Sequence, residues 1–206
     1  KKGKIMKRAL FALALAAALP MSAQASELSY SFVEIDYVAS SDAIQDGPGG
    51  PGLDSEGYGI RGSFGFAENF YVTGAYVKSD LDLASSIDND KWNVGFGYHR
   101  AMYDQADWFV EAGYTKIESN NVFVDDNFYK VSAGIRGSIS DRFEGIAKLS
   151  YNDGADLGGA FYPQYDGAIS ATVGLQWRIN EMWGIVGEIE AFEDATDYTL
   201  GVRASF

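Results

Sequence analysis

Cysteine is absent from the 206 residues of the chain, and histidine occurs once, as His99. The lack of cysteine excludes thiolate metal sites, cysteine nucleophiles and disulfides. A single imidazole also excludes any site that needs two of them. No run of 18 apolar residues occurs, so the sequence offers no candidate for a membrane-spanning helix. We predict neither a metal site nor a cofactor.

Basic residues are scarce outside the N-terminus. Five of the 16 lysines and arginines lie before residue 10, which leaves 11 bases against 29 acids from Ser26 onward, a net charge of −18. A nucleic-acid-binding protein needs a basic footprint that displaces the counterions of phosphate. The charge balance therefore excludes nucleic acid as a partner.

The first 25 residues have the parts of a secretory signal peptide. A basic Met6-Lys7-Arg8 precedes an apolar stretch at 9–19, and the small-x-small pattern Ala23-Gln24-Ala25 follows. These are the n-region, the h-region and the cleavage site of an exported protein. We predict a signal peptide over 1–25, in which residues 1–5 lie upstream of the true start, and a mature domain over 26–206.

The rest of the chain is rich in glycine and aromatic residues and has only four prolines, which is typical of strands. Apolar and polar residues alternate with a period of two, as in half-buried strands. Trp92, Val94 and Phe96, for example, alternate with Asn93 and Gly95. The pattern predicts ten strands, at about 29–40, 56–66, 70–79, 91–99, 108–115, 129–136, 143–151, 169–178, 183–190 and 197–206.

The predicted links differ between the two ends of these strands. Three links have three residues each, between an apolar residue and an aromatic one, and a fourth at about 101–107 is expected to be longer. We call this end the short-turn end. At the opposite end, the long-loop end, four of the five links are long and acidic: 41–54, 79–90, 118–127 and 153–164, with a short link at 193–196.

Ten alternating antiparallel strands fit either a soluble barrel with an apolar interior or a membrane barrel with a polar lumen. The polar face carries charges of both signs, which can neutralise one another inside a lumen. We therefore predict an all-β fold, a ten-stranded antiparallel transmembrane β-barrel of the outer-membrane type. Its predicted lumen charge network consists of Glu34, Asp36, Arg61, Glu111, Lys130, Arg136, Glu144, Lys148, Arg178, Glu188, Glu190 and Arg203.

Aromatic residues bound the apolar face at both ends of the strands. Two aromatic rows around an aliphatic band are the mark of two membrane–water interfaces. The predicted interface aromatics are Phe66, Phe70, Tyr98, Trp108, Phe143, Trp177, Trp183 and Phe206 near the short-turn end, and Tyr58, Trp92, Tyr114, Tyr151 and Tyr198 near the long-loop end.

The chain ends on Phe206 after Tyr198, Leu200, Val202 and Ala204 at alternate positions, and this ending resembles the C-terminal signal of bacterial outer-membrane barrels. The segments 28–38, 57–62 and 69–72 resemble the start of a small proteobacterial barrel family named for a supposed elicitor of a rice immune receptor. A broader resemblance to OmpA-like and OmpX-like small barrels covers 28–206. The resemblance implies an outer-membrane location and a partner in the barrel assembly machinery.

Enzymatic readings fit the sequence poorly. An omptin-like protease, which is also a ten-stranded barrel, needs carboxylates and a His–Asp pair at the extracellular rim, whereas His99 falls at the short-turn end. A lipid-modifying enzyme would need a base near the outer leaflet to activate a serine, and the sequence places no histidine there. We expect His99 to be a hydrogen-bonding residue of the lumen and the protein not to be an enzyme.

The expected partners are outer-membrane lipids and lipopolysaccharide. The long-loop windows hold 14 acids and no base. We expect these acids either to bind Ca²⁺ or Mg²⁺ weakly or to form a solvated acidic surface without bound cations. Lys78 and Lys116 could meet lipopolysaccharide phosphates or extend to the interface. For the barrel we expect a structural or surface-interaction role with a mostly filled lumen, and the alternative is a narrow pore for ions or small solutes.

Overall fold

A computed structural model describes residues 28–45, 52–81, 87–119, 126–154, 167–192 and 195–206. The predicted signal peptide lies outside these residues, and so do the central parts of the long loops. Within the described part of the chain, no helix is long and apolar enough to cross a membrane.

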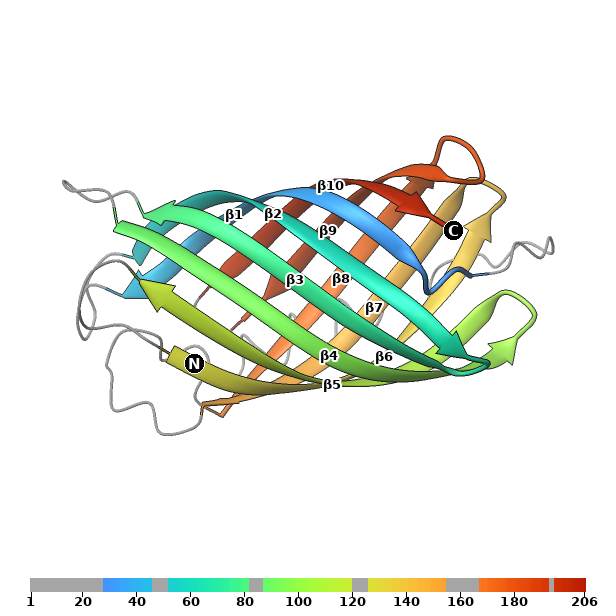
Figure 1. The fold of residues 1–206 in the computed structure, drawn as a ribbon, viewed down its shortest axis with the longest axis horizontal. Coiled ribbons are helices and arrows are strands. Elements are labelled where there is room, and N and C mark those ends of the chain that lie inside the picture. The colour runs from blue at the N-terminus through green and yellow to red at the C-terminus, as the bar shows by residue number, and fades with distance from the viewer. Residues whose placement is uncertain (1–27, 46–51, 82–86, 120–125, 155–166, 193–194) are drawn as a thin grey trace.

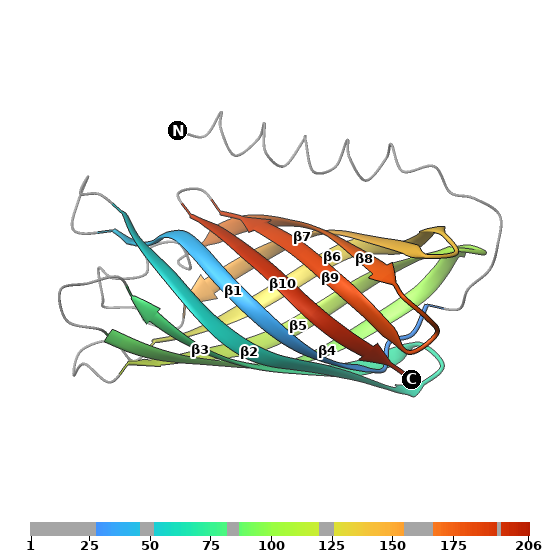
Figure 2. The ribbon, with the colours of Figure 1, turned by 90° about the horizontal axis from the view of Figure 1, so that it is seen from above.

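Ten antiparallel strands close into one barrel, in which each strand pairs with its neighbours in sequence and β1 pairs with β10 (Figure 1). This confirms the predicted fold class. The C-terminus lies at the end of the short turns (Figure 2). The strands are β1 (Phe32–Gln45), β2 (Gly52–Ala67), β3 (Phe70–Leu81), β4 (Ile87–Tyr103), β5 (Ala106–Ser119), β6 (Asp126–Ser140), β7 (Phe143–Gly154), β8 (Ala168–Arg178), β9 (Trp183–Ala191) and β10 (Thr196–Ser205).

The barrel is inverted relative to a soluble protein. Aliphatic side chains point outward and stay exposed, such as Ile60 at 51%, Val94 at 53% and Leu200 at 59%. Polar side chains point inward, and the Glu34 side chain is completely buried. An exposed apolar surface of this extent on a folded chain marks contact with a membrane or a partner.

Strand pairing extends further toward both ends than the alternation predicts. The link expected at about 101–107 is only two residues long, because β4 continues to Tyr103 and pairs it with Ala106. An irregularity between Ala101 and Tyr103 shifts the register there, and such a bulge interrupts the period of two by which a strand is recognised. At the long-loop end β1 to β7 also run into the four windows predicted as loops.

The first predicted strand also begins later than expected. Residues 28–31 leave the sheet, and β1 starts at Phe32. The segment is held against the chain's other end, because the Ser29 hydroxyl donates to the Phe206 carbonyl at 3.0 Å and the Phe206 amide donates to the Ser31 carbonyl at 3.0 Å. The Ser63 hydroxyl donates to the Tyr30 carbonyl at 2.7 Å.

The two faces of β4 allow a matched test of the inverted pattern. Val94→Arg places a charge on the exposed apolar face and should lower the free energy of unfolding in lipid vesicles by about 2–4 kcal/mol. Asn93→Arg places the same charge inside, where Asn93 now donates to Thr115 Oγ1 at 2.9 Å, and should cost less. Urea titrations of the two variants measure the difference, and equal losses would contradict the assigned faces.

Candidate lumen site

Glycines make room for the large side chains that fill the lumen. A Cβ at Gly97 would lie 2.1 Å from the Tyr71 ring, so this ring covers the strand wall at a place where only glycine leaves space. Likewise a Cβ at Gly201 would lie 2.2 Å from the Asp36 carboxylate. Neither neighbour could keep its position beside a larger residue.

The centre of the lumen holds an ion cluster around Glu34. Its carboxylate is paired with Arg61 from β2 and with Arg203 from β10. Arg61 also donates to Glu188 of β9 at 2.8 Å and lies 3.4 Å from Asp36. Arg203 lies 3.9 Å from Glu188. The cluster therefore joins β1, β2, β9 and β10, and within it Arg203 lies between the acids of its two neighbouring strands.

Arg203 has further partners besides the acids. Its guanidinium donates to Gln176 Oε1 at 3.1 Å and lies 3.9 Å from the centre of the Phe32 ring. A cation over an aromatic face is attracted by the ring quadrupole. Arg203 is therefore held by residues of three other strands, β1, β8 and β9, at the point where the barrel closes.

A second group lies toward the long-loop end. Lys130 of β6 donates to Glu190 of β9 at 2.6 Å, and the Ser170 hydroxyl donates to the same carboxylate at 2.6 Å. Lys148 of β7 lines the neighbouring cavity. Beyond this group, a buried apolar cluster covers the lumen: Ile117, Phe128, Phe192 and Ala195.

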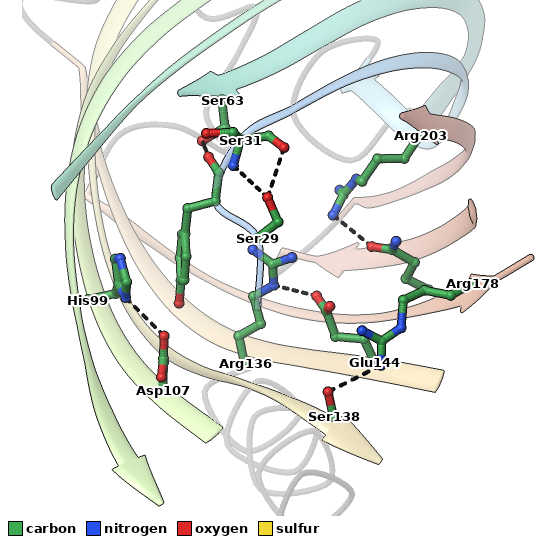
Figure 3. Close-up of polar contacts among 12 residues, drawn as sticks. Ser29, Ser31, Ser63, His99, Asp107, Arg136, Ser138, Glu144, Arg178 and Arg203 are labelled. Carbon is green, nitrogen blue, oxygen red and sulfur yellow. Dashed lines mark hydrogen bonds and ion pairs between the residues drawn. The ribbon is translucent and has the colours of Figure 1, made fainter. Parts of the chain in front are cut away.

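A third group closes the short-turn end around Tyr30, and Figure 3 shows its members His99, Asp107, Arg136 and Glu144. The Tyr30 ring stacks on His99, with ring centres 3.7 Å apart and planes at 14°. The His99 Nδ1 lies 2.9 Å from Asp107 Oδ2. Arg136 pairs with Glu144, and its guanidinium lies 4.8 Å from the Tyr30 ring centre. His99 is thus a hydrogen-bonding residue whose ring is covered by a tyrosine.

Two predicted lumen residues contact polar side chains or backbone rather than the central cluster. Glu111 accepts a hydrogen bond from the Tyr71 hydroxyl at 3.2 Å. Arg178 donates to the Ser138 hydroxyl and to the Ser140 carbonyl, both at 3.3 Å. The structure therefore divides the twelve predicted residues into a central group, two end groups and these separate contacts.

Two lumen residues escape the sequence analysis because they are aromatic. Tyr30 and Phe128 are buried inside, whereas the sequence analysis assigns aromatic residues of a membrane barrel to its outer face. The parity of their positions is the signal that finds them. Phe128 lies two residues before inward Lys130.

The predicted interface aromatics form two rows on the outside. Near the short-turn end, Phe70 contacts Tyr98 with ring centres 5.1 Å apart, and Tyr98 contacts Trp108 at 5.5 Å. Near the other end, Tyr114 contacts Trp92 at 5.7 Å and the further aromatic Tyr129 at 5.5 Å. Neighbouring strands thus present their rings at similar heights.

The two basic residues expected at the interface have acidic partners. Lys78 lies 3.7 Å from Asp88, and Lys116 pairs with Glu118. Both pairs are partly exposed at the long-loop end, where such ion pairs contribute up to about 1 kcal/mol. These contacts compete with binding to lipid phosphates.

No protein-family model matches the chain, and no curated protein matches its sequence. Solved structures match its fold. The NanC porin is 8% identical, with 84% of this chain and 100% of that chain covered and a TM-score of 0.50. An outer membrane channel from Pseudomonas putida F1 is 7% identical, with 90% and 98% covered and a TM-score of 0.51. The chain has the fold of the bacterial outer-membrane barrels, and at these identities the likeness concerns the fold alone.

Removal of Arg203 tests the central cluster. Arg203→Ala leaves Glu34 with one arginine and should lower the free energy of unfolding by about 3–5 kcal/mol, because an uncompensated buried charge is strongly destabilising. Adding Glu34→Gln should restore part of the loss. The exposed Arg142 offers a control, since Arg142→Ala should change stability by less than about 0.5 kcal/mol. Equal stability of Arg203→Ala and the wild type in urea titrations would contradict a buried network.

Proposed function

We propose that the chain is an integral protein of the bacterial outer membrane, exported through its signal peptide, with a structural or surface-interaction role. Its exposed aliphatic band and two aromatic rows support a position in lipid. The fold it shares with outer-membrane barrels agrees with that location. In this orientation the short-turn end faces the periplasm and the long-loop end faces the outside.

The filling of the lumen is the observation that carries this role. Tyr30 covers the short-turn end, the Glu34 cluster crosses the centre, and the apolar cluster with Phe128 covers the long-loop end. Small ten-stranded barrels have little interior space beyond their side chains. The inward polar side chains pair with one another, so the outer surface remains as the place for interaction with other molecules.

The proposed partners follow from the two ends and the outer face. Lipopolysaccharide and other outer-membrane lipids would surround the apolar band, and the barrel assembly machinery would read the last strand ending at Phe206. Acids at the long-loop end, such as Asp80 and Asp90, could attract Ca²⁺ or Mg²⁺ weakly. Membership of the family named for the rice elicitor is part of this proposal and rests on 28–38, 57–62 and 69–72.

A narrow pore is the second candidate. A cavity of about 270 Å³ remains beside the charged groups, and its lining includes Thr73 and Asn93 on one wall and Lys148 and Glu188 on the other. Two proteins with this fold are named a porin and an outer membrane channel. No catalytic role is proposed, because the packing of His99 beneath Tyr30 accounts for this histidine.

Conductance in planar bilayers distinguishes the two candidates. The wild type should show no steady open level. Combining Tyr30→Ala with Arg203→Ala removes the cover of the short-turn end and one central arginine, and should produce steady, cation-selective openings because Glu34 and Glu188 lose a partner. Arg142→Ala, on an exposed turn, should behave as the wild type. A steady, ion-selective open level in the wild type would instead favour the pore.

A further inference from the structure

The outer face of the barrel carries an apolar groove that the lumen does not explain. Its volume is about 700 Å³, and it crosses β7, β8, β9, β10 and β1. The floor and walls follow one row of paired residues, from Gly145 through Leu175, Gly187 and Leu200 to Tyr37. All five are on the outward face.

Small residues hollow out this row. A Cβ built at Gly187 would meet no atom within 4 Å, so the position is open space rather than a place of close backbone approach. Leu175 and Leu200, its cross-strand partners, stand exposed on either side at 47% and 59%. Ala147, in the next row, also lines the groove. The result is a furrow between aliphatic ridges.

The groove matches one hydrocarbon chain in length. Five neighbouring strands span four spacings of about 4.8 Å, or about 19 Å. Because the strands of such a barrel tilt by about 35–45°, this row rises by only about 12 Å along the membrane normal, which lies within the half of a hydrocarbon core of about 30 Å that one leaflet contributes. The groove starts at Gly145, two residues from the short-turn end of β7, and ends at Tyr37 and Tyr198. A chain that enters from the short-turn end can therefore lie along it.

A basic residue lies in the turn at that end of the groove. Arg142 lies in the β6–β7 turn between Ile139 and Gly145, which both line the groove, and it is exposed. A guanidinium suits a phosphate, which it can bind through two parallel hydrogen bonds. Arg142 and the groove together offer a cation beside an apolar furrow, which is the arrangement that a phospholipid complements.

We propose that this groove binds one acyl chain of a glycerophospholipid of the periplasmic leaflet, whose phosphate meets Arg142. Bulk lipid contacts the entire outer band, but in this furrow a chain gains contacts with the side chains along it as well as with its floor. The site is independent of whether the lumen conducts.

Native mass spectrometry of the detergent-purified barrel, titrated with phosphatidylethanolamine, measures the binding. The wild type should hold one lipid more tightly than any further ones. Gly187→Leu fills the furrow and should weaken that first binding by about tenfold. Gly74→Leu is the matched control: Gly74 is also an outward glycine, on β3 outside the groove, and the variant should bind as the wild type does.

The headgroup contact has its own test. Arg142→Gln should weaken the binding of phosphatidylethanolamine by about two- to fivefold, as expected for the loss of an exposed ion pair. The binding of uncharged diacylglycerol should stay unchanged. Electrophoretic mobility without boiling shows that each variant is folded. The proposal is overturned if Gly187→Leu and Gly74→Leu bind equally.

Because the chain has no cysteine, Gly187→Cys also tests whether a second copy occupies the groove. In membranes this variant should stay monomeric under oxidation. An efficient disulfide-linked dimer would show an interface between copies and overturn lipid binding at this site.

Discussion

The buried carboxylate of Glu34 is the constraint on which the closure of the barrel depends. Its direct cross-strand partners are Arg203 on β10 and Arg61 on β2, so one acid lies between two arginines along the same row of the sheet. A slip of one residue by β10 would turn Arg203 to the outer face, and a slip by β2 would do the same to Arg61, because side chains alternate along a strand. Each would then cost about 2–4 kcal/mol near the middle of a bilayer. The charges thus specify the register at the closing seam.

The same arrangement fills the lumen. Arg61 reaches across from β2 to Glu188 on β9, which is not a neighbouring strand, so the ion pair spans the interior rather than following the wall. Arg203 approaches the same Glu188 from β10. Arginine suits this position because its planar group can serve several carboxylates at once. An interaction that fixes register therefore also occupies the space through which a solute would pass.

The period of two was sufficient to predict the ten strands and their faces, because a membrane barrel separates apolar from polar residues at every step, as at Val94 and Asn93. It was insufficient where that separation breaks down. The bulge near Ala101 shifted the phase and hid the short link at 104–105. Tyr30 was missed as a lumen residue for another reason. It lies before the sheet begins, and its place depends on contacts with His99 and Arg136, which are distant in sequence and meet only in the closed barrel.

The charge of the lumen explains where interaction with other molecules is expected. The twelve predicted lumen residues comprise six bases and six acids, so this set is neutral although the chain from Ser26 onward carries −18. The acid excess therefore lies elsewhere, and Asp80, Asp90 and Glu118 place part of it at the long-loop end. A self-neutralised interior offers no strong field to attract ions inward. We therefore expect contacts with other molecules at two surfaces, the acidic long-loop end and the apolar outer face with its furrow at Gly187.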